Sequence, residues 1–278
     1  MTERNLALSM RNACYRYENA ETDTVKGIDL DVEAGEFVAV LGRNGSGKST
    51  LGKMMNALFL PTGGTVALFG TEVKDEDSAY EARKRCGMVF QDPDNQMVAT
   101  IVEEDVAFGC ENLGMEPAEI RRRVAEALKT VGMSEYANTA PHMLSGGQKQ
   151  RVAVAGVIAM GPEMIVFDES TSMLDPVGRQ EIFDLASRLN GQGTTVIWIT
   201  HFMEEAARCG RVVVIDDGAI VLEGTPRRVF TQTERINALG LEVPEMTSLA
   251  VRLAEAGLPV RRDILTTEEM EVELCRLR

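Results

Sequence analysis

The chain has 278 residues, of which 44% are hydrophobic and 26% charged, an ordinary globular composition that excludes wholesale disorder. Its formal charge of −14 argues against binding to nucleic acid or to an anionic membrane surface, because both need a basic protein surface. No stretch approaches the roughly 18 to 20 uncharged apolar residues of a transmembrane helix, and residues 1–17 carry charges where a signal peptide has its apolar segment.

Strands and helices alternate through most of the chain, which is typical of an α/β core with a mostly parallel sheet. Residues 51–59 predict a helix after the first buried strand, with Leu51, Met54, Met55 and Leu58 on one face. Asp216-Asp217-Gly218 predicts a hairpin between the last two strands. The predicted strands are residues 37–41, 164–167, 195–199, 212–215 and 219–222.

The middle of the chain, about residues 97–160, has little strand character and predicts a helical subdomain inserted in the α/β core. Pro117 opens a helix, and Gly132 closes it. The apolar face of this helix consists of Ile120, Val124, Leu128 and Val131.

Two short helices are predicted after Phe230. Thr247 or Ser248 can cap the first, which Gly257 ends. Its predicted apolar face is Leu249, Leu253 and Ala256.

In the second helix, Thr266 and Glu269 predict a capping box, and Leu265 can pack as a staple on Met270. Its predicted apolar face is Met270, Leu274 and Leu277. Helices this short are unstable alone, so the tail must pack on something.

Several residues are predicted to have structural roles only. The five cysteines include no CxxC pair and predict reduced, buried thiols of a cytosolic protein rather than disulfides or a zinc site. His142 is predicted to lie on the surface.

A glycine-rich loop separates the predicted strand 37–41 from the predicted helix 51–59. Its sequence fits G-x-x-x-x-G-K-[ST] in the strand–loop–helix context of a P-loop, where backbone N–H groups and the helix dipole attract phosphate. Lys48 can reach the β- and γ-phosphates, and the Ser49 hydroxyl can bind Mg²⁺. The predicted nucleotide-binding residues are Gly42, Arg43, Asn44, Gly45, Ser46, Gly47, Lys48, Ser49 and Thr50.

A second Mg²⁺ ligand is predicted at the end of the buried strand 164–167. The carboxylate of Asp168 emerges there and can hold the ion directly or through water. Glu169 comes next and points to the other side of the chain, where a carboxylate can polarise water for attack on the γ-phosphate.

The sequence LSGGQ, residues 144–148, predicts another anion-binding helix N-terminus. Two glycines precede the helical run 149–159, and Ser145 adds a hydroxyl donor. One nucleotide bound between the P-loop of one subunit and this element of another would explain why the chain has both.

These motifs resemble those of the ATP-binding cassette (ABC) ATPases, over about residues 5–230. LSGGQ is the signature of that family, and residues 42–50 and 165–169 resemble its Walker A and Walker B motifs. The resemblance implies ATP and Mg²⁺ as ligands and a P-loop NTPase fold. That fold has an N-terminal antiparallel β subdomain, a mostly parallel core sheet, an inserted helical subdomain and, here, a C-terminal extension at residues 231–278.

The same resemblance implies further roles. Tyr17 resembles the A-loop aromatic that stacks on adenine, with Tyr15 as a rival. Gln91 resembles the Q-loop glutamine that contacts Mg²⁺, and His201 resembles the H-loop histidine that contacts the γ-phosphate. Thus Glu169 and His201 are the implied catalytic residues, and Mg²⁺ is held by Ser49, Gln91 and Asp168. The residues implied to act on the nucleotide of the partner subunit are Ser145, Gly146, Gly147, Gln148 and the D-loop residue Asp175.

A finer resemblance is to the ATPases of energy-coupling-factor (ECF) transporters, which import vitamins or cobalt and nickel ions. Residues 91–97 and 101–109 carry it, and DESTSMLDP, residues 168–176, resembles the first of the two paired ATPases. LGLEVP, residues 239–244, resembles the start of their C-terminal extension, a dimer contact. Two residues depart from the broad ABC pattern, because Ser170 replaces the commoner proline and Phe202 the commoner aspartate.

The predicted function is the ATP-binding and ATP-hydrolysing subunit of an ECF-type importer at the cytoplasmic face of the cell membrane. It would drive uptake of a vitamin, another micronutrient or a transition-metal ion through a transmembrane coupling subunit that docks beside residues 91–97. Its other partners would be a membrane substrate-binding subunit and a second ATPase. The resemblance favours a paralogue for that ATPase and leaves a second copy open. Nucleic acid and bare lipid are not expected partners.

Two alternative functions fit the sequence less well. An ABC ATPase that remodels nucleic acid or ribosomes would carry coiled coils, a zinc insert or two fused cassettes, and the chain has none of these. A regulatory subunit without turnover would lack the glutamate or the histidine, but Glu169 and His201 are both in place.

Overall fold

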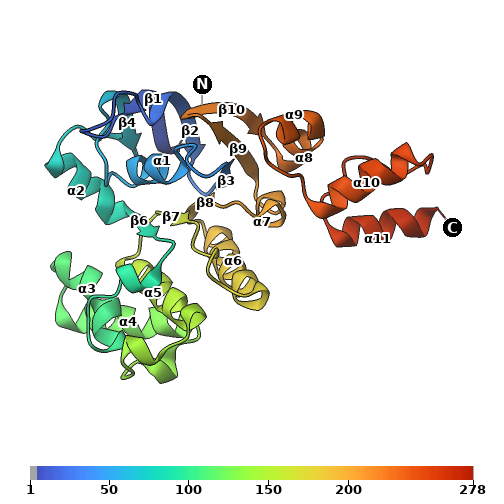
Figure 1. The fold of residues 1–278 in the computed structure, drawn as a ribbon. Helices are drawn as coiled ribbons and strands as arrows, with labels where there is room; N and C mark the ends of the chain where they lie inside the picture. Colours follow the sequence, from blue (N-terminus) through green and yellow to red (C-terminus); the bar gives the residue numbers. More distant parts are fainter. Residues whose placement is uncertain (1–4, 278) are drawn as a thin grey trace.

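The computed structural model describes residues 5–277, which form two sheets flanked by helices (Figure 1). The first sheet is antiparallel, with strands in the order β2-β1-β4-β5. The second has the order β10-β9-β3-β8-β7-β6 and is parallel except for the β9–β10 pair. The strands are β1 (Leu6–Tyr15), β2 (Val25–Glu33), β3 (Phe37–Gly42), β4 (Gly63–Leu68), β5 (Thr71–Glu72), β6 (Cys86–Val89), β7 (Met164–Asp168), β8 (Thr195–Ile199), β9 (Arg211–Asp216) and β10 (Ala219–Gly224).

Helices cover both faces of the six-stranded sheet, and none in residues 5–277 is long and apolar enough to cross a bilayer. Figure 1 shows α3, α4 and α5 grouped on one side of that sheet, α1 on the other, and α10 with α11 projecting beyond α8 and α9. The helices are α1 (Lys48–Met55), α2 (Glu76–Arg85), α3 (Val102–Asn112), α4 (Pro117–Thr130), α5 (Gly146–Met160), α6 (Pro176–Gly191), α7 (Met203–Ala207), α8 (Pro226–Phe230), α9 (Thr233–Ala238), α10 (Glu245–Glu255) and α11 (Thr267–Arg276).

The six-stranded sheet separates two hydrophobic cores. In β3, Val38 and Val40 belong to the core that contains α1 and the antiparallel sheet. The intervening Ala39 and Leu41 belong to the core beneath α3–α6. This alternation follows from the two-residue period of a strand, and burial on both faces explains why the strands are almost continuously apolar. The predicted α/β fold, with its antiparallel subdomain and inserted helices, is confirmed.

The parallel strands place four segments of the predicted site at one edge of the sheet. Register aligns Val40 with Ile199, Ile199 with Asp168, and Phe167 with Val89. Because parallel strands end at the same edge, the loops after β3, β8, β7 and β6 meet there.

The predicted helix of the middle region is confirmed, and a second one starts earlier than expected. Helix α4 begins at Pro117, and Gly132 follows it with a positive φ of 70°. Helix α5 begins at Gly146 rather than residue 149, because Ser145 caps it. The prediction that α1 runs to Phe59 is wrong. It ends at Met55, Ala57 turns into positive φ, and Leu58 is 42% exposed.

The predicted cap of the first C-terminal helix is wrong, and its predicted face holds only at Leu253. Helix α10 begins after Pro244, so Thr247 lies inside it, fully buried, where its hydroxyl donates to the carbonyl of Ile264. Tertiary packing therefore outweighs the local capping preference. The packed face is Met246, Ala250 and Leu253, whereas Leu249 and Ala256 are exposed.

The predictions for the last helix hold only in part. Thr266 caps α11 by accepting from the Glu269 amide, but the Glu269 carboxylate accepts from Leu265 rather than closing the box. Leu265 packs in the main core and Met270 in the small C-terminal cluster, so the staple is wrong. The other two members of the predicted face are exposed, Leu274 by 41% and Leu277 by 38%.

The cysteines are free, as predicted, but not all are buried. Cys86, Cys110 and Cys209 are buried, Cys14 is half-buried and Cys275 is exposed. Burial raises the pKa of the Cys86 thiol to about 12, which makes it inert. His142 is exposed, as predicted.

Candidate functional site

The P-loop connects β3 to α1 and surrounds a buried lysine. Gly45 and Gly47 have φ of 82° and 100°, a left-handed backbone that suits glycine alone. Lys48 is 4% exposed, and its ammonium donates to the carbonyls of Gly42 and Arg43 at 2.8 and 3.1 Å. The Ser46 hydroxyl oxygen is buried with no hydrogen-bond partner in the described chain. A buried cation and an unsatisfied hydroxyl fit the phosphates of a nucleotide.

Ser49 and Asp168 offer oxygen ligands at the start of α1 and the end of β7. The Ser49 hydroxyl donates to Oδ1 of Asp168 at 3.0 Å. Burial raises the pKa of Asp168, and the Ser49 hydrogen bond partly opposes that rise. A hydroxyl and a carboxylate so close together fit Mg²⁺, which when bound would neutralise charge on phosphate oxygens.

Glu169 lies between Lys48 and His201. Its Oε1 is 3.4 Å from Nζ of Lys48, and its Oε2 is 3.5 Å from Nδ1 of His201. The residue has a φ of 47°, and its amide donates to the Ile199 carbonyl. A positive φ is uncommon in a non-glycine residue, and here it forms the sharp turn that follows β7. This turn places the carboxylate next to the histidine.

Tyr17 rather than Tyr15 is the exposed ring beside the P-loop. Its side chain is 41% exposed, and its hydroxyl is 3.0 Å from Oγ1 of Thr50. Tyr15 instead stacks on Phe59, with ring centroids 4.7 Å apart, and burial raises its pKa. The geometry therefore supports Tyr17 as the base-stacking residue.

The structure does not bring every predicted residue into this cluster. Gln91 is exposed after β6, and its side chain makes no hydrogen bond within residues 5–277. Asp175 is exposed and caps α6 by accepting from the Gly178 amide at 2.9 Å. Ser145 and Gln148 bond reciprocally at the start of α5.

The signature glycine Gly146 is not explained by packing within the chain. A Cβ built on it would meet no atom within 4 Å, and its φ is not in the left-handed region. The chain itself thus has no steric need for glycine at this position.

The two departures from the ABC pattern lie beside the cluster. The Ser170 hydroxyl is buried without a hydrogen-bond partner in the described chain, and Phe202 packs under the Arg179 guanidinium at 4.0 Å. Glu205, which contacts neighbouring segments through three hydrogen bonds, was not predicted. The only indication of Glu205 in the sequence was a carboxylate in the short helical run after His201.

Comparison with known proteins decides the family. Residues 25–172 match the sequence profile described as ABC transporter. The chain belongs to the ABC transporter family. This membership confirms the predicted resemblance, the ATPase activity, and ATP with Mg²⁺ as ligands.

Relatives within the ABC family match nearly the whole chain. The energy-coupling factor transporter ATP-binding protein EcfA1 of Clostridium novyi (strain NT) is 55% identical over 98% of both chains. That of Clostridioides difficile (strain 630) is 53% identical over 97% of this chain and 99% of the relative.

Solved ABC structures agree with the fold. The structure of cbiO1 from Clostridium perfringens, part of the ABC transporter complex cbiONQ, has a TM-score of 0.76 and 35% identity, covering 91% of this chain and 98% of that one. A dimeric ATP-binding cassette in a post-hydrolysis state with ADP and Pi has a TM-score of 0.72 and 31% identity, covering 79% and 98%.

The position of Glu169 predicts separable effects on hydrolysis and binding. Glu169→Gln keeps the side-chain shape but removes the carboxylate predicted to act as the base, so we expect hydrolysis to fall on the order of a hundredfold or more while ATP binding stays near wild type. Lys48→Ala should instead lose ATP binding, since it removes the buried cation. Turnover and nucleotide affinity of the assembled complex measure both, and normal turnover in Glu169→Gln would show that Glu169 is not the base.

Proposed function

We propose that this ABC ATPase is the ATP-hydrolysing subunit of an ECF-type importer, peripheral to the membrane on its cytoplasmic face. The observation that carries the proposal is near full-length similarity to EcfA1 proteins in a chain whose Lys48, Asp168, Glu169 and His201 form one cluster. A regulatory subunit without turnover would not need that cluster.

Purification of the tagged chain from detergent-solubilised membranes tests this proposal. We expect a second ATPase, a transmembrane coupling subunit and a membrane substrate-binding subunit to co-purify, with ATPase activity. Co-purification with nucleic acid or ribosomes, and no membrane protein, would support the alternative function instead.

The partner ATPase is proposed to complete the nucleotide site. Residues 145–148 and Asp175 make no hydrogen bond or ion pair with the P-loop of their own chain in the described structure, and Gly146 faces open space. A nucleotide bound to the partner's P-loop would occupy that space and explain the glycine.

Bulk at Gly146 should therefore damage the partner's site. In a mixed dimer, Gly146→Arg places its Cβ where no atom of its own chain lies within 4 Å, so we expect impaired nucleotide turnover at the partner's P-loop. The matched control is Gly191→Arg at the end of α6, where a Cβ also meets no atom within 4 Å. Separate labelling of the two P-loops measures each site, and selective loss at the P-loop of the variant chain would contradict the assignment.

The coupling subunit is proposed to dock beside the Q-loop and helical subdomain. Val98 is 61% exposed, and its amide and that of Ala99 donate to the Asp105 carboxylate, which holds the loop in place. A cavity of about 760 Å³ between α3 and α4, lined by Ala107, Met115 and Ile120 among others, offers apolar surface in the same subdomain. Exposed apolar side chains in such a setting suit a protein partner.

A charge at Val98 should release the ATPase from membranes that contain the complex. Val98→Asp is expected to lose co-sedimentation while retaining ATP binding, because a carboxylate cannot be buried unpaired at the contact. Val98→Thr, nearly the same shape without charge, is the control. Met97 is less suitable for this test, because it packs against the main core. Full membrane retention of Val98→Asp would place the contact elsewhere.

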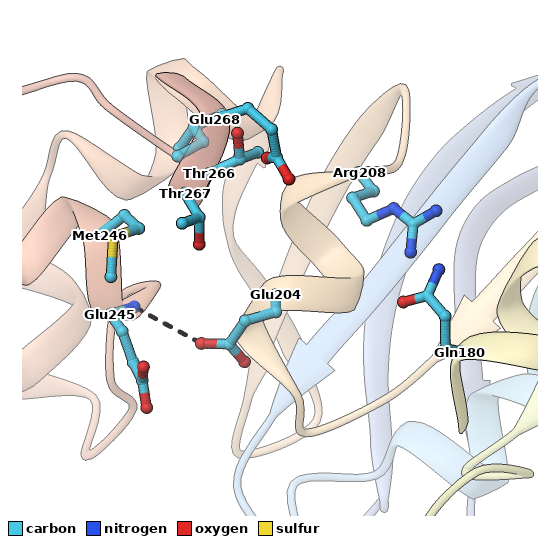
Figure 2. Close-up of a pocket in the computed structure, with 9 residues that line it drawn as sticks. Gln180, Glu204, Arg208, Glu245, Met246, Thr266, Thr267 and Glu268 are labelled. Carbon is cyan, nitrogen blue, oxygen red and sulfur yellow. Dashed lines mark hydrogen bonds between the residues drawn. The ribbon is translucent and has the colours of Figure 1, made fainter. Parts of the chain in front are cut away.

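We propose that residues 245–277 form the part of the C-terminal extension that mediates pairing. Leu241 and Val243 lie in the main core, whereas α10 and α11 have a small core of their own. Arg227 of α8 joins this part to the ATPase core through Asp263, and Leu265 packs in the main core. Arg227 of α8 donates to Glu269 at 2.6 Å, and the Glu245 amide donates to Glu204 of α7 at 3.4 Å beside a cavity of about 560 Å³ (Figure 2).

Exposed apolar side chains on α11 should hold the second ATPase even without nucleotide. Val272 is 54% exposed and Leu274 41%. The double substitution Val272→Asp/Leu274→Asp is expected to weaken pairing on gel filtration, with Glu271→Ala on the same helix as control. Deletion from Leu241 would open the main core and is a poorer test. A nucleotide-free pair that stayed fully associated in the double variant would contradict this role.

A further inference from the structure

Glu205 is a buried carboxylate on α7, the short helix that follows the turn with His201. It is 8% exposed and accepts three hydrogen bonds. The donors are Oγ1 of Thr171 at 2.9 Å, Nε1 of Trp198 at 2.8 Å and Oγ1 of Thr200 at 2.6 Å. A buried carboxylate is tolerated only when such donors satisfy it. All three donors are themselves 1% exposed, so water does not compete for them.

Two of these bonds fix the turn that carries His201. A threonine hydroxyl has one proton to donate, and Thr200 also accepts from the Phe202 amide at 3.0 Å. Its proton is therefore directed to Oε2 of Glu205. The Thr200 hydroxyl thus links the residues on both sides of His201 to Glu205.

The remaining bond fixes the segment between Glu169 and Asp175. Thr171 lies within this segment, where the Ser172 amide donates to the Glu169 carbonyl and the Leu174 amide donates to the Thr171 carbonyl. Anchoring Thr171 to Oε1 of Glu205 therefore holds the whole turn. The two anchored segments meet again where Glu169 approaches His201 at 3.5 Å.

We propose that Glu205 is a positioning residue that ties the segment bearing Glu169 and Asp175 to the turn bearing His201, so that the two move as one body. This inference rests on the proposed roles of Glu169 and His201. Its consequence is that a displacement of Asp175 by the partner subunit reaches His201 through a chain of short hydrogen bonds.

Thr171→Val opens this clamp while leaving Glu205 two donors. We expect kcat of the assembled complex to fall on the order of tenfold or more with ATP affinity unchanged, because misplacement of reacting groups slows chemistry rather than binding. The matched control is Thr195→Val at the far end of β8. That threonine is also 1% exposed, and its hydroxyl accepts from the Gly35 amide outside the site. It should lower thermal stability comparably without lowering kcat.

Glu205→Gln separates position from charge. Its carbonyl oxygen can accept from Trp198 and Thr200, and its amide can donate to the Thr171 hydroxyl, so all three contacts survive. We expect kcat close to wild type. In the double variant Thr171→Val/Thr200→Val, kcat should fall little further than in the worse single variant, since either change opens the same clamp.

Three results would contradict the clamp. The first is a kcat in Thr171→Val equal to that of wild type or of Thr195→Val, and the second is a loss of kcat in Glu205→Gln. The third is a kcat in the double variant that falls by the full product of the two single effects. These results are distinct from failure of the proposed function. Normal turnover in Glu169→Gln would show that Glu169 is not the base. Slow turnover in Glu169→Gln together with wild-type kcat in Thr171→Val would contradict only the role of Glu205.

Discussion

The parallel pairing of β3, β8 and β7 is the constraint on which the site depends. Each strand delivers a different group to the same edge: β3 the P-loop, β7 the pair Asp168–Glu169, and β8 the turn with His201. Backbone bonds continue past the strand ends, since the Thr200 amide donates to Val40 and the Glu169 amide to Ile199. A slip of one residue would exchange the side chains of the two cores, so burial on both faces locks the register. The hydrophobic core thereby sets the geometry of the charged groups.

The charged cluster at this edge is balanced but incomplete within the chain. Lys48 can donate three hydrogen bonds, two of which go to carbonyls, and its approach to Glu169 at 3.4 Å is longer than either. The ammonium is therefore satisfied mainly by neutral groups, which leaves most of its charge for an anion. In a chain with a net charge of −14, attraction for phosphate comes from Lys48, the P-loop amides and the helix dipole rather than from overall composition. A nucleotide can thus bind where the protein as a whole would repel it.

Contiguous motifs made most of the site predictable, and long-range contacts account for what was missed. The P-loop, the end of β7 and the signature each combine a local element with its functional side chain in fewer than about ten residues, so their spacing carries the information. Glu205 was missed because its proposed role depends on hydrogen bonds from Thr171 and Trp198, which form only in the folded protein. The cap predicted at Thr247 failed for the same reason, since a contact with Ile264 overrides the local preference. Gln91 stays outside the described contacts of the cluster, and its role remains a prediction.

Three features of residues 5–277 are not explained by packing within the described chain, and one second ATPase would explain them all. Gly146 faces open space at the start of α5, Asp175 is exposed at the start of α6, and Val272 with Leu274 exposes apolar surface on α11. Gly146 lies at the N-terminus of α5, where an anion is the natural occupant, so that contact should form and break with nucleotide. The third feature is an apolar surface, so contact through it should not depend on bound nucleotide. A pair joined by both kinds of contact can open at the nucleotide site after hydrolysis while α11 keeps the subunits together, which is the behaviour that repeated transport cycles need.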